Sequence, residues 1–301
     1  MEENPEMSTF GRSTAYMIFC LAALFGGGSL IVFLVFLLAG SPEVLSLKLG
    51  VDEVLWWDTG LCISFFIQHS GMVRRAFRQR LTYFIPAEYE GAVYAIASGI
   101  VLLVLIVLWQ KSGTTSEVSR SVFRWLSHIV YFLSLAGFIW GIRALGVFDP
   151  FGLRPILGCL QGKKPRRMSF VIRGPYRWVR HPLYLFMLLM LWSCPDLTRD
   201  RLLFNSLWTV WIVIGSILEE RDLVLEFGDV YREYQHRVPM LIPLRFHPQV
   251  QFKGRPHDEG EHGRGTLVAK LSYEITDTAE EDHQRYIEDG IRQADLLPLQ
   301  K

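Results

Sequence analysis

Six long apolar stretches constrain the fold of this chain more than any other feature. They are Ala15 to Ala39, Leu55 to Ile67, Val93 to Trp109, Val122 to Leu145, Leu183 to Trp192 and Leu202 to Leu218. A helix needs about 20 apolar residues to cross a hydrocarbon layer of about 30 Å, so the second and fifth stretches are short for this purpose. The sequence therefore predicts an all-α, polytopic bundle of about six transmembrane helices.

Composition agrees with a membrane protein, because 50% of the 301 residues are hydrophobic and 13% are aromatic. This is too apolar for a soluble domain of the same size. The first stretch is longer than the apolar region of a secretory signal and has no small-residue cleavage site after Gly40. We therefore expect it to be a retained membrane anchor.

Cationic residues are distributed unevenly between the loops. One set of loops holds Arg12, Arg74, Arg75, Arg78, Arg80, Arg154, Lys163, Lys164, Arg166, Arg167, Arg173, Arg177 and Arg180. The opposite set has few cations, with Arg199 and Arg201 as a mild exception. Because positively charged loops stay in the cytosol, we expect a protein of the cell inner membrane with both termini cytosolic.

The composition changes at residue 245, which divides the chain into two predicted domains. Residues 1–244 form the membrane domain, with its functional core at residues 173–243, and residues 245–301 form a small polar cytosolic tail. In the tail, Thr266 to Ile275 predict a strand and Ala279 to Leu297 predict an amphipathic helix. A partly disordered acidic tail is an equal alternative.

Other common sites lack their sequence signals. The four cysteines, Cys20, Cys62, Cys159 and Cys194, have no paired spacing, so we expect neither disulfides nor a metal site. No phosphate-binding loop follows a predicted strand, and we expect no nucleic-acid partner. Gly26, Gly27 and Gly28 lie inside the first stretch, where small residues favour close helix packing.

Polar residues crowd at one end of the last two apolar stretches. The segment RGPYRWVRHPLYL, Arg173 to Leu185, has Pro182 where a helix would begin, which puts His181 at the helix entrance. Glu219 and Glu220 stand at the end of the following stretch. The sequence therefore predicts one polar cluster beside each of the two helix ends.

A short turn around Pro195 predicts that these two helices form an antiparallel hairpin, which brings the clusters side by side. Such a site suits a zwitterionic amino acid with a further cation. Glu219 or Glu220 would pair with an ammonium group, Arg180 and His181 with a carboxylate, and aromatic rings with a sulfonium. Taken singly, these residues are also typical of interfacial anchors and solvated helix faces.

The segments GPYRWVRHPLY, EERDL, FGDVYREY and VPMLIP occur in this order from about Arg173 to Pro243. This order resembles the membrane methyltransferase superfamily that includes isoprenylcysteine carboxyl methyltransferases and phospholipid methyltransferases. The resemblance implies S-adenosylmethionine as the cofactor. It also implies a set of cofactor-binding residues, namely Tyr176, Arg180, His181, Tyr184, Glu219, Glu220 and Tyr231.

A closer resemblance extends upstream. The segments QHSGMVRRAF from Gln68, IPAEYEGAVYAIAS from Ile85 and VFDPFGLRPIL from Val147 are similar to bacterial methanethiol S-methyltransferases, whose product is dimethyl sulfide. Two residues depart from that pattern, since Phe186 replaces a glycine and Val147 a histidine. The bulky Phe186 is predicted to narrow the pocket, so a prenylated cysteine, a lipid or another small thiol stays an alternative acceptor.

His69 and Arg180 are the predicted catalytic residues. Ionisable groups at membrane depth are costly and often functional, and His69 would accept the proton of a thiol or orient the thiolate. A structural hydrogen bond with Gln68, Ser70 or a neighbouring helix is an equal alternative for His69. The thiolate would then displace the sulfonium in line, with the protein supplying alignment and exclusion of water.

Asp149 and Arg154 form the last predicted pair. They belong to a predicted cytosolic loop. We interpret them as an ion pair or loop anchor, with a place in the acceptor pocket as the alternative.

Two functions of other classes remain open. A haem protein of related fold would use His69 and His128 as axial ligands, but the predicted topology puts them toward opposite faces of the membrane. A non-catalytic scaffold acting through its tail would bind no S-adenosylmethionine.

Overall fold

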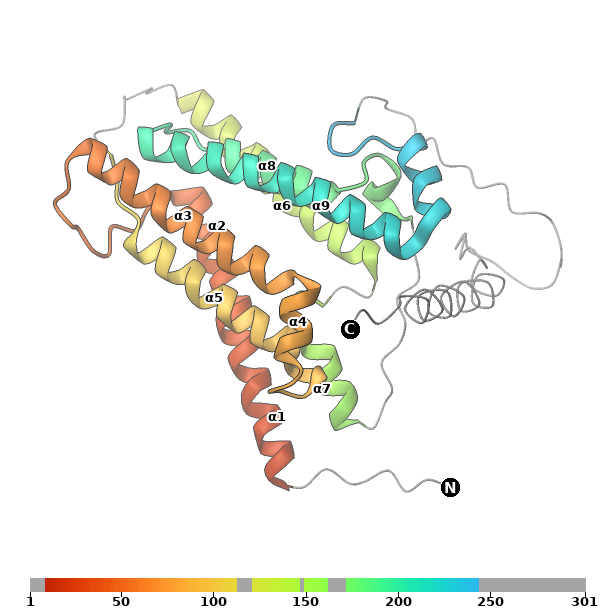
Figure 1. The fold of residues 1–301 in the computed structure, drawn as a ribbon. Coiled ribbons are helices and arrows are strands. Elements are labelled where there is room, and N and C mark those ends of the chain that lie inside the picture. Colours follow the sequence, from red (N-terminus) through yellow and green to blue (C-terminus); the bar gives the residue numbers. More distant parts are fainter. Residues whose placement is uncertain (1–8, 113–120, 147–148, 162–171, 244–301) are drawn as a thin grey trace, which may run out of the picture. The chain divides into compact units, whose positions relative to one another are not determined.

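A computed structural model describes residues 9–112, 121–146, 149–161 and 172–243 (Figure 1). Within these residues the chain is all helical and contains no strand, which confirms the predicted fold class. The helices are α1 (Thr9–Leu21), η1 (Ala22–Gly27), α2 (Gly28–Ala39), α3 (Val51–Val73), α4 (Arg75–Leu81), η2 (Ala87–Tyr89), α5 (Glu90–Leu108), α6 (Ser121–Leu145), α7 (Leu153–Leu160), η3 (Gly174–Arg177), α8 (Pro182–Trp192) and α9 (Arg199–Arg237).

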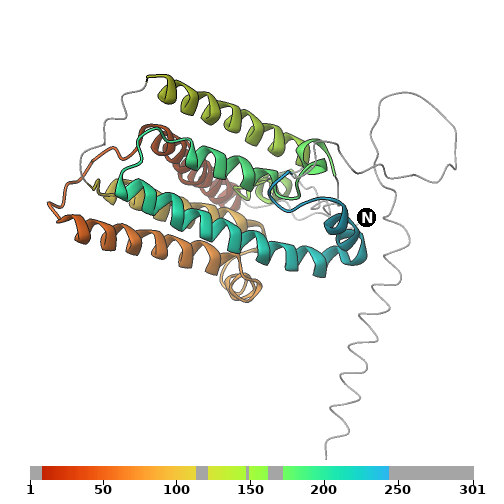
Figure 2. The same ribbon diagram turned by 90° about the horizontal axis from the view of Figure 1, so that it is seen from above.

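The long helices pack side by side. Figure 2 shows α6, α8, α9 and α3 in turn across the bundle, with α8 in contact with α6 and α9, and α3 in contact with α9 and α5. Aromatic rings of α2, α3 and α9 fill the space between them, and Phe33 and Phe65 both stack on Trp208. This aromatic core fixes α9, which carries most of the candidate site.

All six predicted stretches coincide with helices, but the count of six spans is not confirmed. Within the described part of the chain, four segments are long and apolar enough to cross a membrane, namely Gly11–Ala39, Ala87–Leu108, Val122–Leu145 and Arg199–Arg237. Helix α3 has sufficient length but contains Asp58, Gln68 and His69, which lower its hydropathy. Helix α8 has 11 residues and so rises only about 16 Å.

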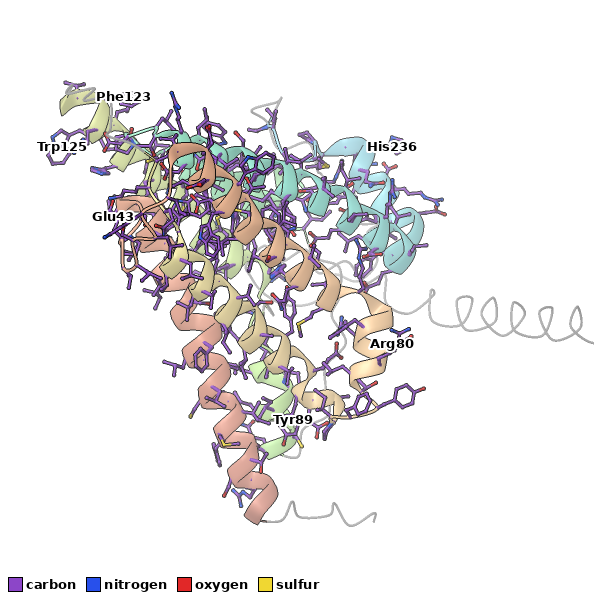
Figure 3. The ribbon with its side chains drawn as sticks, turned by 60° about the vertical axis from the view of Figure 1, so that its left-hand side comes forward. Glu43, Arg80, Tyr89, Phe123, Trp125 and His236 are labelled. Carbon is purple, nitrogen blue, oxygen red and sulfur yellow. The ribbon has the colours of Figure 1, made fainter. Side chains whose placement is uncertain are left out.

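Large apolar side chains cover the outside of the bundle. Trp56 is 79% exposed, and Trp125 is 70% exposed. Extensive exposed apolar surface on helices of this length is typical of contact with lipid, so the chain is a multi-pass membrane protein. Figure 3 places Trp125 at one end of the bundle and Arg80 and His236 at the other, which we call the far end and the site end.

Small residues allow two helices to approach closely near the middle of the bundle. A Cβ atom on Gly99 of α5 would lie 2.1 Å from the carbonyl oxygen of Phe25, and one on Gly26 would lie 3.2 Å from the Ala95 Cβ. The packing interpretation of Gly26 is therefore confirmed, and the chain around it forms a π-helical turn, η1.

Buried polar contacts fasten the far end. Asp200 accepts hydrogen bonds from the indole of Trp109, at 3.2 Å, and from the backbone and hydroxyl of Ser112. Arg201 donates to the carbonyl oxygens of Phe36 and Leu37 in the last turn of α2. The position of Arg201 in the charge pattern thus has a structural reason, because its guanidinium is buried on a helix end rather than exposed in a loop.

The described helices belong to one compact unit. Both of its described ends, Thr9 and Pro243, lie at the site end, because α1 leads to the far end and α9 returns from it. The predicted tail strand, the tail helix and Val147 lie outside the described residues. The boundary at residue 245 stays a prediction.

Candidate active site

The site is built on the α8–α9 hairpin. Helix α8 begins at Pro182 with His181 directly before it, as the sequence predicts, and residues 193–198 connect it to α9. Helix α9 runs from Arg199 to Glu219 over about 30 Å, a length similar to the thickness of a hydrocarbon layer. The ends of the hairpin therefore meet at the site end, and the prediction that the two polar clusters lie side by side is confirmed.

Glu220 is the centre of the cluster. Its Oε1 atom accepts hydrogen bonds from Arg180 Nε at 2.8 Å and from the Tyr231 hydroxyl at 2.9 Å. His181 Nε2 lies 2.8 Å from the same oxygen and donates to it when that nitrogen carries a hydrogen. Its Oε2 atom accepts from the amide of Gln235. The side chain is 9% exposed, so this carboxylate is enclosed and already bonded by protein groups.

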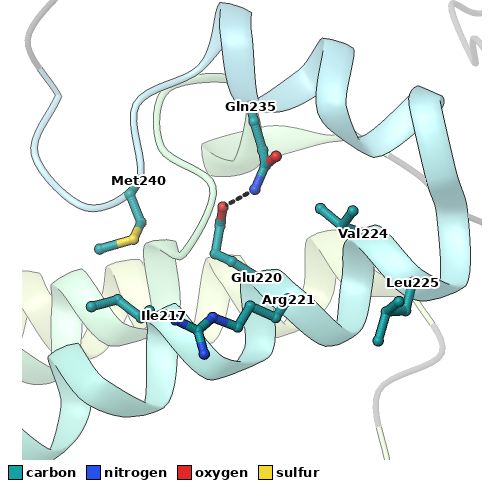
Figure 4. A pocket seen from close by; sticks show the side chains of 7 residues that line it. All are labelled: Ile217, Glu220, Arg221, Val224, Leu225, Gln235 and Met240. Carbon is teal, nitrogen blue, oxygen red and sulfur yellow. Dashed lines mark hydrogen bonds between the residues drawn. The ribbon is translucent and has the colours of Figure 1, made fainter.

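A break in α9 makes this enclosure possible. Gln235 follows Glu220 by 15 positions, which would separate the two by about 22 Å in a straight helix. Gly228 interrupts the helix with φ +56° and ψ −133°, a conformation that suits glycine. The chain folds back there, so that Gln235 lies above Glu220 (Figure 4).

Arg180 joins the segment before α8 to the segment after α9. Its NH1 atom donates to the carbonyl oxygens of Gln235 and Val238, at 2.8 and 2.5 Å. The backbone amides of Arg180 and His181 donate to the carbonyl oxygens of Pro239 and Met240, at 2.9 and 3.0 Å. The guanidinium thus holds together the two segments that flank the hairpin.

Glu219 has a different environment from its neighbour. It accepts a hydrogen bond from the Tyr184 hydroxyl at 2.7 Å, and His181 Nδ1 lies 3.7 Å from the same oxygen. Its side chain is 44% exposed, compared with 9% for Glu220. A carboxylate in this position retains acceptor capacity for a ligand.

Tyr176 lies at the edge of the cluster, in η3. Its backbone carbonyl accepts a hydrogen bond from the Tyr234 hydroxyl. Burial raises the pKa of the Tyr176 hydroxyl above its ordinary value, and the nearby carboxylate of Glu219 adds to the rise. The hydroxyl therefore stays protonated and available as a donor.

A groove opens beside Glu220 (Figure 4). Its volume is about 480 Å³, within the range of pockets that hold small ligands. The lining residues are Ile217, Glu220, Arg221, Val224, Leu225, Gln235 and Met240. Glu220 is thus shared by the groove and the hydrogen-bonded cluster, while most of the remaining lining is apolar.

His69 lies on α3, apart from the hydrogen bonds of Glu220. Its Nε2 atom is 2.7 Å from the hydroxyl of Tyr94 on α5. This is a hydrogen bond with a neighbouring helix, as the structural alternative predicts, whereas Gln68 donates to Ser98 and Ser70 accepts from the indole of Trp211. His69 is four residues from the site end of α3, whereas His128 is in the second turn of α6 at the far end, as the predicted topology requires.

The ring of Phe186 packs against Gly137 of α6. A Cβ atom on Gly137 of α6 would lie 2.4 Å from the ring of Phe186. The ring therefore fills the notch that this glycine leaves between α6 and α8. The expected narrowing of the pocket receives no support from this contact.

Asp149 anchors the loop before α7. Its carboxylate accepts hydrogen bonds from the backbone amides of Leu153 and Arg154, at 3.0 and 2.7 Å. The Arg154 side chain donates instead to the Gly146 carbonyl oxygen. These contacts support the loop-anchor interpretation of Asp149.

Sequence reasoning assigned no role to three positions that matter here. Gly228 lies inside the segment FGDVYREY and Gln235 directly follows it, but the roles of both depend on the break in α9. Tyr94 belongs to the segment that begins at Ile85, but its partner His69 lies 25 positions earlier. Among the described residues, no group of three or more His, Cys, Asp or Glu side chains could hold a metal ion.

Comparison with known proteins identifies the family. The chain is 38% identical over 247 residues to a methanethiol S-methyltransferase from a Pseudomonas species, a match that covers 80% of this chain and 90% of that protein. The chain belongs to the methanethiol S-methyltransferase family. The methanethiol S-methyltransferase of Pseudomonas deceptionensis is 36% identical over 209 residues, covering 64% and 75% of the two chains.

Nurim from Xenopus laevis is a more distant relative. It is 26% identical to this chain over 179 residues, a match that covers 55% of this chain and 61% of nurim. No family model matches the chain, and no solved structure matches it. The resemblance drawn from the motifs is confirmed, and a methyltransferase requires a methyl donor and an acceptor at its site.

Proposed function

We propose that this protein transfers the methyl group of S-adenosylmethionine to methanethiol, forming dimethyl sulfide and S-adenosylhomocysteine. The observation that carries the proposal is the unequal pair of carboxylates at the hairpin end. Glu220 is enclosed by Arg180, His181, Tyr231 and Gln235, while the adjacent Glu219 is 44% exposed. One carboxylate is suited to organise the site and the other to meet a cationic ligand.

The residues fit S-adenosylmethionine in both size and charge. A groove of about 480 Å³ beside Glu220 can accept a molecule of that size, and its apolar lining suits the less polar parts of the ligand. Glu219 would accept hydrogen bonds from the ammonium group. When bound, S-adenosylmethionine supplies a methyl group on a positively charged sulfur that a thiolate can attack.

Arg180 acts through Glu220 in this proposal. Its Nε and NH1 groups are bonded to Glu220 and to two backbone carbonyls, and its side chain is only 11% exposed, so it is poorly placed to meet the ligand's carboxylate. Arg221 lines the groove and is exposed, which makes it the better candidate for that carboxylate. Tyr176, Tyr184 and His181 would complete the cofactor side, with Tyr184 holding Glu219 in place.

His69 is proposed as the base on the acceptor side. Phe65 and Trp211 flank the imidazole, with ring centroids 5.2 Å away in both cases, and such surroundings suit a small apolar thiol. The bilayer would concentrate that thiol. The Arg-rich segments and both described ends share the site end, which supports cytosolic termini in the inner membrane and delivery of the cofactor from the cytosol.

The proposal can be tested in membranes that contain the protein. Supplied with S-adenosylmethionine and methanethiol, they should release dimethyl sulfide into the headspace and form S-adenosylhomocysteine in equal amount. Membranes containing Glu226→Gln, an exposed carboxylate elsewhere on α9, should behave as wild type. If the protein binds S-adenosylmethionine but forms no dimethyl sulfide, methanethiol is not the acceptor. Methyl transfer to a prenylated cysteine or a lipid would then identify the acceptor instead.

A further inference from the structure

His69 is held from three sides by aromatic residues. Tyr94, Phe65 and Trp211 each have a ring centroid 5.2 Å from that of the imidazole. Of the three, only Tyr94 offers a hydrogen-bonding group to the imidazole, and its hydroxyl lies 2.7 Å from Nε2 and 3.2 Å from Nδ1. The orientation of the imidazole therefore depends on Tyr94.

The Tyr94 hydroxyl is a better partner for a basic His69 than a permanently charged group would be. When it accepts a hydrogen bond from Nε2, the closer of the two ring nitrogens, Nδ1 carries the lone pair that can receive a proton. Once the ring is protonated, the same hydroxyl oxygen stabilises the N–H that faces it. Tyr94 would thus orient His69 in the way that the third residue of a catalytic triad orients the base.

Further contacts hold Tyr94 and His69 next to the cofactor side. Ser98, one turn after Tyr94 on α5, accepts a hydrogen bond from Gln68 at 3.3 Å and so ties α5 to α3 beside the pair. The indole of Trp211 donates to Ser70 at 3.1 Å, which ties α9 to α3. The His69 ring is thereby fixed relative to the helix that carries Glu219.

Tyr94 also faces the hairpin. Its hydroxyl lies within electrostatic range of the Tyr184 hydroxyl, which donates to Glu219. The titratable groups around Tyr184 on this side of the bundle include Tyr94 of α5, Tyr176 of η3 and Glu219 of α9. A thiol that gives its proton to His69 would be next to the residues that hold the methyl donor.

We propose that Tyr94 is a positioning residue that fixes the tautomer and orientation of His69 for deprotonation of the acceptor thiol. The inference rests on the proposed function. The thiol proton moves to the imidazole, and a lone pair of the sulfur forms the new bond to the methyl carbon. The bond from that carbon to the donor sulfur breaks, and its electron pair stays on S-adenosylhomocysteine. The imidazole then releases its proton to water.

The test is Tyr94→Phe, which removes one hydroxyl and keeps the ring. At neutral pH its kcat with methanethiol should fall at least about tenfold, which corresponds to about 1.4 kcal/mol, while the KM for S-adenosylmethionine stays unchanged. The deficit should shrink as the pH rises toward the pKa of the thiol, because solvent then supplies the thiolate. His69→Ala should show the same pattern, and adding Tyr94→Phe to it should cost little more.

A matched pair of thiols separates positioning from a merely structural role. Ethanethiol and 2,2,2-trifluoroethanethiol are close in size, but the fluorinated thiol is more acidic and needs a base less. Tyr94→Phe should therefore lose more activity with ethanethiol than with its fluorinated counterpart. Tyr131→Phe is the control, because it removes a hydroxyl bonded to the Leu34 carbonyl oxygen and should affect both thiols equally.

The outcomes distinguish this inference from the proposed function. An equal deficit of Tyr94→Phe at every pH and with both thiols would overturn the positioning role, as would full activity. In both cases the wild-type protein still methylates thiols, so the proposed function stands. A wild-type protein that binds S-adenosylmethionine but methylates no thiol would overturn both.

Discussion

Glu219 and Glu220 are adjacent in α9 but occupy opposite environments. The Glu220 carboxylate is 9% exposed and is bonded to Arg180, His181, Tyr231 and Gln235, whereas the Glu219 carboxylate is 44% exposed beside Tyr184. Their separation follows from helix geometry, since successive residues point about 100° apart around the axis. We therefore expect the two carboxylates to respond differently to the same substitution.

Glu219→Gln should weaken cofactor binding without destabilising the fold. Loss of a charge-assisted hydrogen bond worth about 1.5–3 kcal/mol raises the Kd roughly 10–150-fold. Equilibrium binding of S-adenosylmethionine to the detergent-solubilised protein measures this directly, and thermal unfolding checks that stability is retained. Glu226→Gln on the same helix is the matched control, and equal binding by both variants would contradict the role of Glu219.

Glu220→Gln should instead destabilise the protein. It leaves the buried guanidinium of Arg180, which is 11% exposed, without its carboxylate. Breaking one partner of a buried ion pair costs about 3–5 kcal/mol. We expect a clearly lower Tm in detergent. When Arg180→Met is combined with Glu220→Gln, the decrease in Tm should be smaller than the sum of the decreases that the two single variants show. An unchanged Tm would mean that the hydrogen-bonded cluster does not hold the hairpin.

Gly228→Ala should disturb the site through the backbone alone. A Cβ atom there meets no heavy atom within 4 Å, but the positive φ is strained for alanine by about 1–3 kcal/mol. The break that brings Tyr231 and Gln235 to Glu220 should shift, which lowers both Tm and cofactor affinity. Gly215→Ala, also in open space on α9 but in regular helix, should have no such effect. Equal effects of the two substitutions would contradict this account of the break.

Gly137→Ala should separate α6 from α8. The new methyl group would lie 2.4 Å from the ring of Phe186, and overpacking of this kind typically costs about 1–3 kcal/mol. Phe186→Leu in the same chain should recover part of the lost Tm, because the smaller side chain makes room. Gly60→Ala, which meets nothing within 4 Å, is the control. Additive effects of Gly137→Ala and Phe186→Leu would mean that the two residues do not share this contact.

The sequence predicted the helices and the hairpin because both depend on local patterns. Apolar stretches gave the helix positions, Pro182 gave the start of α8, and the short turn after Trp192 brought His181 to Glu220. The predicted count of six spans is not confirmed, since α3 buries Asp58 and carries His69 at the expense of hydropathy, and α8 is only 11 residues long.

Contacts that depend on distant packing could not be read from the sequence. Arg201 looks like an exception to the charge pattern until its hydrogen bonds to the end of α2 are seen, some 164 positions earlier in the chain. The hydrogen bonds of Arg180 to the carbonyl oxygens of Gln235 and Val238 were not predicted, because they follow from the break at Gly228. Tyr94 could be linked to His69 only once α3 and α5 were side by side.

The most direct test of the central claim follows the methyl group itself. Purified protein is given methanethiol and S-adenosylmethionine that carries a trideuterated methyl group, and the headspace is analysed by mass spectrometry. Our account predicts dimethyl sulfide with one trideuterated methyl group, formed quickly by wild type and Glu226→Gln and much more slowly by Glu219→Gln at low cofactor concentration. Dimethyl sulfide without the label, or none from protein that binds the cofactor, would contradict it.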